Sequence, residues 1–282
     1  MRSTDHRKLA ALAGTLAALA AACDRPPSLV ICHNANCAEP ADPERDDTLE
    51  ALQESLTLER DGLPVFDGVE LDTFFRAADD TCLYAHDLDR DQTPALEPAL
   101  VMAEYFRREG PIGHGDTFYV AVELKSHVSA DKTDVHDAAQ LAAHATCAWE
   151  VYQAIAEAAV ANDRDVVMIF EAFNPALLRA VIDATPAALP IPVEYSAIQG
   201  VPAPLDNQTR ELGAYQGLPL SYVEFHDQWI LDAQYEAVRS LGAQLAIFMF
   251  SATSETFSVI EQYRPRLIYT SEATLVRRWL DR

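Results

Sequence analysis

Two carboxylates and a histidine stand close together between residues 68 and 87, in a spacing that could support chemistry. If residues 69–74 form a strand, Glu70 and Asp72 point to the same side, because side chains two apart share a face. Carboxylates buried side by side repel each other and resist leaving water unless a cation compensates them. A hard-cation site with oxygen ligands is one interpretation. An exposed acidic pair on an amphipathic strand is the other.

A second strand is expected after the polar turn at 76–80. This strand, at 81–87, would return along the first and bring His86 close to the two acids. A histidine beside a bound cation is suited to general acid or base catalysis.

Two further apolar runs end in groups that could react. The run at 29–32 leads into His33, and the run at 118–124 ends with Glu123 and Lys125 two residues apart. Each of these groups would therefore lie at the end of a strand, where side chains of neighbouring strands can meet.

This set of motifs resembles the glycerophosphodiester phosphodiesterase family of the PLC-like phosphodiesterase superfamily, from about Leu29 to the C-terminus. The resemblance implies that His33 and His86 act as general acid and base on a phosphodiester. It also implies a divalent cation, Ca²⁺ or Mg²⁺, and a lysine that contacts a phosphate oxygen. The cation ligands would be Glu70, Asp72 and Glu123, and the lysine would be Lys125.

The chain departs from the family in ways that indicate a divergent member. Family members usually follow the first histidine with Arg-Gly, whereas here Asn34 comes next and brings no charge. The sphingomyelinase D type phospholipases also lack that arginine and carry His-x-x-Asn, which His33 to Asn36 matches. The Trp-Thr segment near the C-terminus is replaced by 248–251. Candidate substrate contacts, besides the lysine, are Asn34, Asn36, Phe173, His226, Phe248 and Phe250.

The spacing of apolar runs predicts a (β/α)8 TIM barrel, which is an α/β fold. Runs that open at Leu29, Val69 and Phe118 are followed by five more, with helix-like stretches between them. The five are 166–170, 191–195, 220–225, 244–248 and 266–270. The returning strand near His86 is expected to be a hairpin outside the barrel, and 89–114 a loop insertion. Residues 29–282 would form one domain with its reactive groups at the carboxyl ends of the strands.

The N-terminus has the pattern of an exported lipoprotein. Basic residues precede a short apolar run at 9–22, which is too short to span a bilayer comfortably and ends at Cys23. Residues 1–22 are interpreted as a signal peptide, Cys23 as the lipidation site and 23–28 as a tether. The expected location is the bacterial cell envelope, as a membrane-anchored lipoprotein on the periplasmic side. Cleavage and release as a secreted protein is the alternative.

Charge narrows the range of partners. The formal net charge is −23, and removing 1–22 would take away three basic residues and one acidic residue, which gives −25. Such a surface repels nucleic acid. An anionic phosphate substrate would therefore need a local cation, which a metal ion and Lys125 could provide.

Four cysteines remain besides Cys23, and an exported compartment permits them to form disulfides. Spacing allows three complete pairings among Cys32, Cys37, Cys82 and Cys147. One disulfide expected among them is a bridge that closes the loop after His33.

The sequence favours a metal-dependent phosphodiesterase acting on a glycerophosphodiester or a related phospholipid-derived diester. One alternative is a phospholipase of the lyase type, which would use the same residues to form a cyclic product. The other is a non-catalytic binding lipoprotein on a decayed barrel.

Overall fold

The structure is a computed structural model that describes residues 27–38, 42–87, 92–125, 137–199 and 212–282. The interpretation of 1–22 as a signal peptide, and of Cys23 as a lipidation site, lies outside the described residues. Within the described ranges no helix is both long and apolar enough to cross a bilayer.

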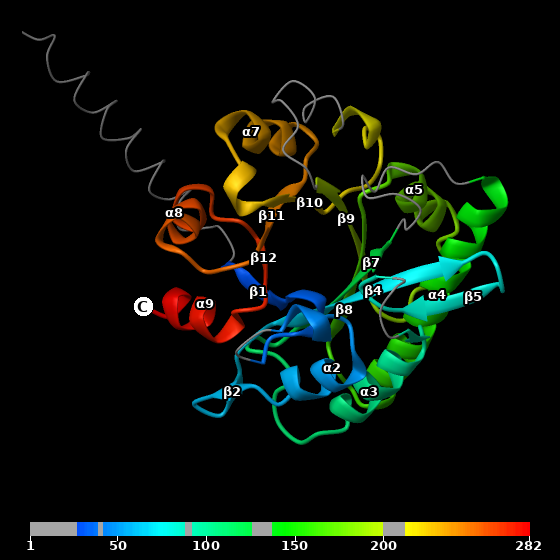
Figure 1. Ribbon diagram of the computed structural model, residues 1–282, viewed down its shortest axis with the longest axis horizontal. Coiled ribbons are helices and arrows are strands. Elements are labelled where there is room, and N and C mark those ends of the chain that lie inside the picture. The colour runs from blue at the N-terminus through cyan, green and yellow to red at the C-terminus, as the bar shows by residue number, and fades with distance from the viewer. Residues whose placement is uncertain (1–26, 39–41, 88–91, 126–136, 200–211) are drawn as a thin grey trace, which may run out of the picture.

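Eight parallel strands of the described chain close into a barrel surrounded by helices (Figure 1). Closure occurs because the first strand pairs in parallel with both the last strand and the second barrel strand. The predicted TIM barrel is therefore confirmed. In chain order its strands are β1 (Leu29–Cys32), β4 (Gly68–Arg76), β7 (Phe118–Leu124), β8 (Val166–Ala172), β9 (Val193–Gln199), β10 (Tyr222–His226), β11 (Gln244–Met249) and β12 (Leu267–Thr270).

Alternation along the strands divides the core into two parts. Inward-facing apolar residues such as Ile31, Ala121 and Ile169 fill the barrel, whereas Val30, Val120 and Phe170 face the helices. Toward the carboxyl ends of the strands, the inward positions change from apolar to charged residues. The barrel thus has an apolar floor and a polar mouth.

Helices cover the outside of the barrel and mostly begin at residues that suit a helix N-terminus. Thr48, Asn174 and Thr253 each accept a backbone N–H in the first turn, and Asp137 forms a capping box with Gln140. The described helices are α2 (Leu49–Ser55), α3 (Glu97–Phe106), α4 (Ala138–Ala161), α5 (Pro175–Asp183), α7 (Asp232–Ser240), α8 (Ser254–Tyr263) and α9 (Ala273–Leu280), with 3-10 turns η1 (His33–Ala35), η2 (Pro43–Arg45) and η3 (Asp227–Trp229).

Two sequence predictions need correction. The segment 89–114, expected to be a loop, contains α3, which buries Met102 and Phe106 although Leu96 before it provides no side-chain cap. Tertiary packing of an apolar face, rather than a capping signal, stabilises this helix. The fifth barrel strand, expected at 191–195, runs at 193–199 instead, so Ile191 and Pro192 precede the strand.

A hairpin leaves the barrel after β4, as predicted. The strand β5 (Thr81–Tyr84) returns antiparallel to β4 and pairs in turn with β6 (Thr93–Pro94). A separate small hairpin joins β2 (Glu59–Arg60) to β3 (Leu63–Pro64). Close packing of β4 on β7 requires Gly68, because an added Cβ would lie 2.2 Å from the backbone oxygen of Tyr119.

Candidate active site

Three buried carboxylates converge at the mouth of the barrel. Glu70 and Asp72 lie two residues apart on β4, and Asp72 is in register with Glu123 on β7. One ligand oxygen from each of the three lies within 4.8 Å of the others. The exposed fractions are 1%, 0% and 3%, so the bulk solvent does not compensate their charge. The exposed acidic pair considered from the sequence is therefore excluded.

Electrostatics show that this cluster resists full ionisation. Burial and the neighbouring Glu123 raise the pKa of Glu70 to about 7. Burial likewise raises the pKa of Asp72 to about 6, although the Lys125 ammonium counteracts the shift. Asp72 Oδ1 is buried and has no hydrogen-bond partner in the described part of the chain. Close, buried oxygens with excess negative charge fit a divalent cation.

Lys125 follows β7 and brings one positive charge into the cluster. Its Nζ lies 2.9 Å from Asp72 Oδ2 and 2.7 Å from Glu123 Oε2. Burial lowers the pKa of Lys125, but the two carboxylates outweigh burial and hold it well above the ordinary value. The ammonium is therefore charged at neutral pH and contacts two of the three carboxylates.

His33 begins the turn η1 directly after β1. Its Nε2 lies 3.6 Å from Glu70 Oε2, and its ring stacks on Phe248 with centroids 6.2 Å apart. Burial is the main reason that its pKa falls to about 4, and nearby Asp72 only partly counteracts this. His33 is therefore neutral at physiological pH and can accept a proton.

His86 reaches the site from the hairpin, just after β5. Its Nδ1 lies 2.7 Å from Asp87 Oδ2, and because a carboxylate can only accept, Nδ1 donates. The neutral ring then has an unprotonated Nε2. An orienting carboxylate behind a histidine is a common arrangement in acid/base catalysis.

A cavity of about 220 Å³ joins these groups. Both histidines, Glu70, Glu123 and Lys125 line it, whereas Asp72 lies in the carboxylate cluster behind. The predicted substrate contacts that also line it are Phe173, His226, Phe248 and Phe250. Three lining residues were not anticipated from the sequence: Ile198, Glu224 and Trp229.

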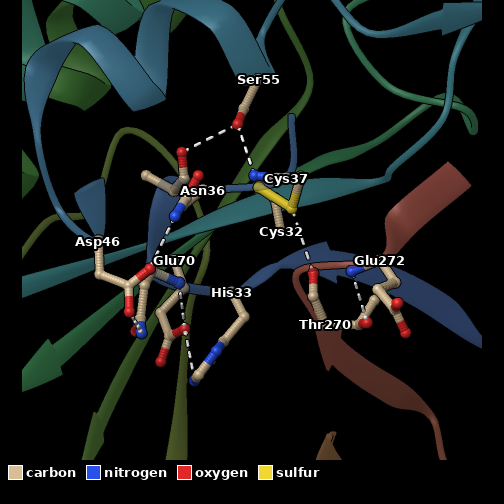
Figure 2. Close-up of a disulfide and its surroundings, with 11 residues drawn as sticks. Cys32, His33, Asn36, Cys37, Asp46, Ser55, Glu70, Thr270 and Glu272 are labelled. Atoms are coloured by element: carbon tan, nitrogen blue, oxygen red, sulfur yellow. Dashed lines mark hydrogen bonds and ion pairs between the residues drawn. A yellow bond between two sulfur atoms is a disulfide. The ribbon is translucent and has the colours of Figure 1, made fainter. Parts of the chain in front are cut away.

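Asn34 and Asn36 do not line this cavity. The side-chain amide of Asn36 donates to Asp46 over 2.9 Å (Figure 2). The side-chain amide of Asn34 also donates to Asp46, over 3.2 Å, and its backbone N–H donates to Glu70 Oε2 over 3.0 Å. The two asparagines therefore shape the loop after β1. Among the described residues, Lys125 is the single basic side chain of the lysine or arginine type that lines the cavity. Their assignment as substrate contacts stays a prediction.

Two disulfides hold the segments that carry the histidines. Cys32 and Cys37 bridge the turn that contains His33, which confirms the staple expected there (Figure 2). Cys82, which lies in the hairpin four residues before His86, pairs with Cys147 of α4. The pairing that the sequence left open is thereby resolved, and each disulfide restricts one histidine-bearing segment.

Aromatic rings form the wall beside β10 and β11. The ring of His226 stacks on Trp229 at 4.6 Å and meets Phe248 edge-on at 4.9 Å. Behind it, Asp227 Oδ1 lies 3.0 Å from His226 Nδ1 and Asp227 Oδ2 accepts from Thr256 over 2.6 Å. This wall gives the cavity an aromatic side opposite the carboxylate cluster.

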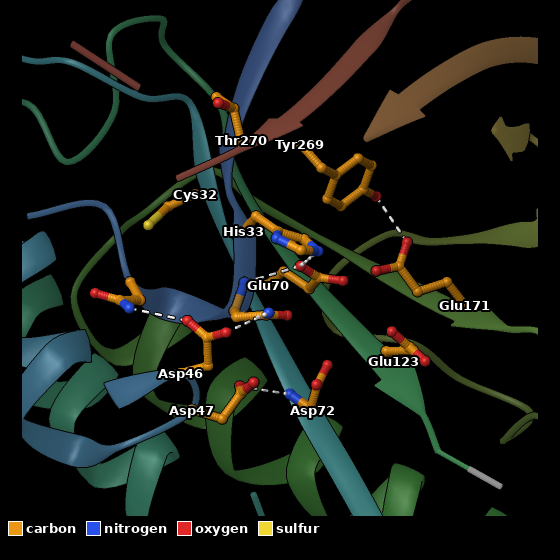
Figure 3. A network of polar contacts seen from close by, with 12 residues as sticks. Cys32, His33, Asp46, Asp47, Glu70, Asp72, Glu123, Glu171, Tyr269 and Thr270 are labelled. Carbon is orange, nitrogen blue, oxygen red and sulfur yellow. Dashed lines mark hydrogen bonds and ion pairs between the residues drawn. The ribbon is translucent and has the colours of Figure 1, made fainter. Parts of the chain in front are cut away.

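Two more buried acids face the barrel interior and were missed in the sequence. Glu171 is the last residue but one of β8, and Glu224 lies within β10, at 0% and 2% exposure. Tyr269 donates to Glu171 over 2.7 Å across the barrel (Figure 3). Burial is the leading reason that the pKa of both acids is raised well above the ordinary value. Each stands in an apolar run near a strand end, which is the signal that identified Glu70 and Asp72.

Comparison with known proteins supports the fold only. No family model and no curated protein matches the sequence. Among solved structures, the chain is similar to a phosphodiesterase from Oleispira antarctica in complex with the product sn-glycerol-3-phosphate, with 13% identity, TM-score 0.58, and 91% of this chain and 98% of that chain covered. A glycerophosphodiester phosphodiesterase from Parabacteroides distasonis gives 14% identity and TM-score 0.58 over the same shares of the two chains. The family resemblance is thus confirmed at the level of the fold.

Proposed function

We propose that this protein is a metal-dependent phosphodiesterase. The observation that carries the proposal is that His33, His86 and Lys125 line one cavity with the Glu70 and Glu123 carboxylates. Similarity in fold to a phosphodiesterase solved with sn-glycerol-3-phosphate supports a glycerophosphodiester as substrate.

The carboxylate cluster of Glu70, Asp72 and Glu123 would hold the cation, and Ca²⁺ or Mg²⁺ suits its all-oxygen ligands. When bound, the cation supplies positive charge for the nonbridging phosphate oxygens. Lys125 adds a second positive charge beside the same oxygens. His33, neutral because burial lowers its pKa, accepts a proton from the attacking water molecule. His86, oriented by Asp87, acts as the acid when its Nε2 has also taken up a proton from solvent, and it then gives that proton to the leaving alkoxide.

A panel of phosphodiesters tests this function, assayed with and without chelator, with the products read by phosphorus NMR. We expect a phosphomonoester that forms only when Ca²⁺ or Mg²⁺ is present. A cyclic phosphate would instead identify the lyase reaction. Absence of turnover on every diester, with the cation bound, would contradict the proposal and favour a binding protein.

We also propose that the protein is exported and anchored through Cys23. Ser28 and the start of β1 lie at the end of the barrel opposite the cavity, where Ser28 Oγ donates to the Pro265 backbone. Cys23 precedes Ser28 by five residues, which span at most about 18 Å, so a lipid on Cys23 would hold this opposite end near the bilayer. The cavity would then open away from the membrane, which favours a water-soluble diester. Cys23→Ala should move the protein from the detergent phase to the aqueous phase, and equal partition of both forms would contradict anchoring.

A further inference from the structure

We propose that Glu224 determines specificity by accepting a hydrogen bond from a hydroxyl or ammonium group on the alcohol part of the substrate. The inference rests on the proposed function and deepens it. Glu224 is a lining residue of the 220 Å³ cavity, yet it is not part of the cluster formed by Glu70, Asp72 and Glu123.

The position of Glu224 in the barrel separates it from that cluster. In the strand order, β10 is four strands from β4 in either direction, so Glu224 faces Glu70 and Asp72 from the opposite wall. A phosphate group beside the cluster and Lys125 would extend one of its alcohol groups across the cavity. That group would reach the wall formed by Glu224, His226 and Trp229.

The bonding of Glu224 shows that it is available to a ligand. Glu224 Oε2 is buried and has no hydrogen-bond partner within the described residues. Buried polar atoms in folded proteins are nearly always paired, because an unpaired one loses its hydration without replacement. Glu171 Oε1 is likewise without a hydrogen-bond partner among the described residues, but Tyr269 donates to its Oε2 and Glu171 does not line the cavity. Of the two additional acids, Glu224 is therefore the one placed to meet the substrate.

The surroundings define what kind of group would bind. Trp229, Phe248 and Ile198 provide apolar surface for a short carbon chain, and Glu224 provides one acceptor among them. A site with one buried acceptor rejects an analogue that lacks the matching donor, because the acceptor is then left unpaired. Glycerol and ethanolamine groups carry such donors, whereas a propyl group does not.

The test uses three p-nitrophenyl phosphodiesters whose second alcohol is glycerol, 2-aminoethanol or n-propanol, with p-nitrophenol release as the readout. We expect the wild type to favour a donor-bearing ester over the propyl ester by about 10- to 100-fold in kcat/KM. In Glu224→Leu this ratio should fall toward one. Glu224→Gln retains an acceptor oxygen but cannot ionise beside a bound cationic group, so it should keep a preference for glycerol but lose one for the ammonium.

Controls separate folding, metal binding and recognition. Glu194→Gln removes a carboxylate that binds Tyr222 outside the cavity, over 2.6 Å, and should leave the ratio unchanged. Thermal unfolding of each variant verifies folding, and calorimetric titration with Ca²⁺ counts bound ions. An unchanged ratio in Glu224→Leu, an equal loss on all three esters, or the loss of one bound Ca²⁺ would overturn the inference.

Binding without turnover distinguishes the two proposals. The Ca²⁺-loaded wild type should bind sn-glycerol 3-phosphate or 2-aminoethyl phosphate more tightly than n-propyl phosphate, and Glu224→Leu should bind all three alike. If this preference is present but no ester is hydrolysed, the role of Glu224 stands and the proposed phosphodiesterase activity falls. Equal binding of all three by the wild type would overturn the role of Glu224.

Discussion

Lys125 Nζ lies 2.9 Å from Asp72 Oδ2, so a buried ammonium shares the carboxylate that we expect to bind a cation. Both groups come from adjacent strands at the same level of the barrel, because Lys125 N–H donates to the Thr73 carbonyl, one residue beyond Asp72. Lys125 therefore neutralises part of the cluster, and its charge also opposes a metal ion at the same place.

Replacing Lys125 should separate these two effects. Lys125→Met removes the repulsion between the ammonium and the bound cation, so Ca²⁺ should bind several-fold more tightly in calorimetric titration. The phosphate loses a charged donor, so kcat/KM on a glycerophosphodiester should fall by about 10²-fold. Lys125→Arg serves as the matched control that retains the charge. Weaker cation binding in Lys125→Met would show that the lysine organises the carboxylates rather than competes with the metal.

The stability of the cation-free protein should fall as pH rises from about 4.5 to about 7. The pKa of Glu70, raised to about 7 in the folded state, means that the folded protein holds a proton that the unfolded chain releases near pH 4.5. The stabilisation from that proton is complete below 4.5 and is lost above 7, on the order of 3 kcal/mol for one such carboxyl. Asp72, with its pKa raised to about 6, contributes in the same direction.

His33 contributes in the opposite direction, because its pKa of about 4 lies below the ordinary 6.5, but this contribution ends near pH 6.5. Thermal unfolding in chelator at pH 5 to 8 measures the net trend. Added Ca²⁺ should raise the unfolding temperature most at pH 8, where the cation no longer competes with protons. Glu70→Gln should flatten the profile. A cation effect that is largest at pH 5 would contradict the assigned cluster.

Each proposed acid/base histidine should be required for turnover but not for cation binding. His33→Ala and His86→Ala should each lower kcat by about 10²- to 10⁴-fold, since that is the usual contribution of a positioned acid or base. Calorimetric Ca²⁺ binding should persist in both variants. His114→Ala is a suitable control, because this histidine bonds the Pro64 carbonyl outside the cavity. Near wild-type kcat in either site variant would refute its acid/base role.

The two disulfides should contribute unequally to the free energy of unfolding. Cys82 and Cys147 are 65 residues apart, whereas Cys32 and Cys37 are 5 apart. On the chain-entropy model, removing the long-range bridge by double serine substitution should cost about 4 kcal/mol, and removing the short one about 2 kcal/mol. Denaturant unfolding of the two double variants measures both. A larger loss from the Cys32–Cys37 pair would show that it stabilises folded contacts instead.

The sequence by itself determined the barrel and most of its site. Eight apolar runs at helix-sized intervals predict alternating strands and helices, and parallel strands in a closed barrel place Glu70, Asp72 and Glu123 at the same rim. Those predictions depend on the periodic spacing of apolar residues, which can be read directly from one sequence. The helix α3 escaped prediction because its stability comes from a buried face and not from a local capping signal.

Only the tertiary structure decided which side chains share the cavity. Asn34 and Asn36 come within three residues of His33, yet neither lines the cavity. The backbone φ angles of Asn34 and Ala35 are positive, and both asparagine side chains donate hydrogen bonds to Asp46, away from the cavity. Glu224 is 99 residues from Lys125 in sequence, yet closure of the barrel places both on one cavity. Neither outcome can be read from spacing, because barrel curvature and loop conformation set the direction of each side chain.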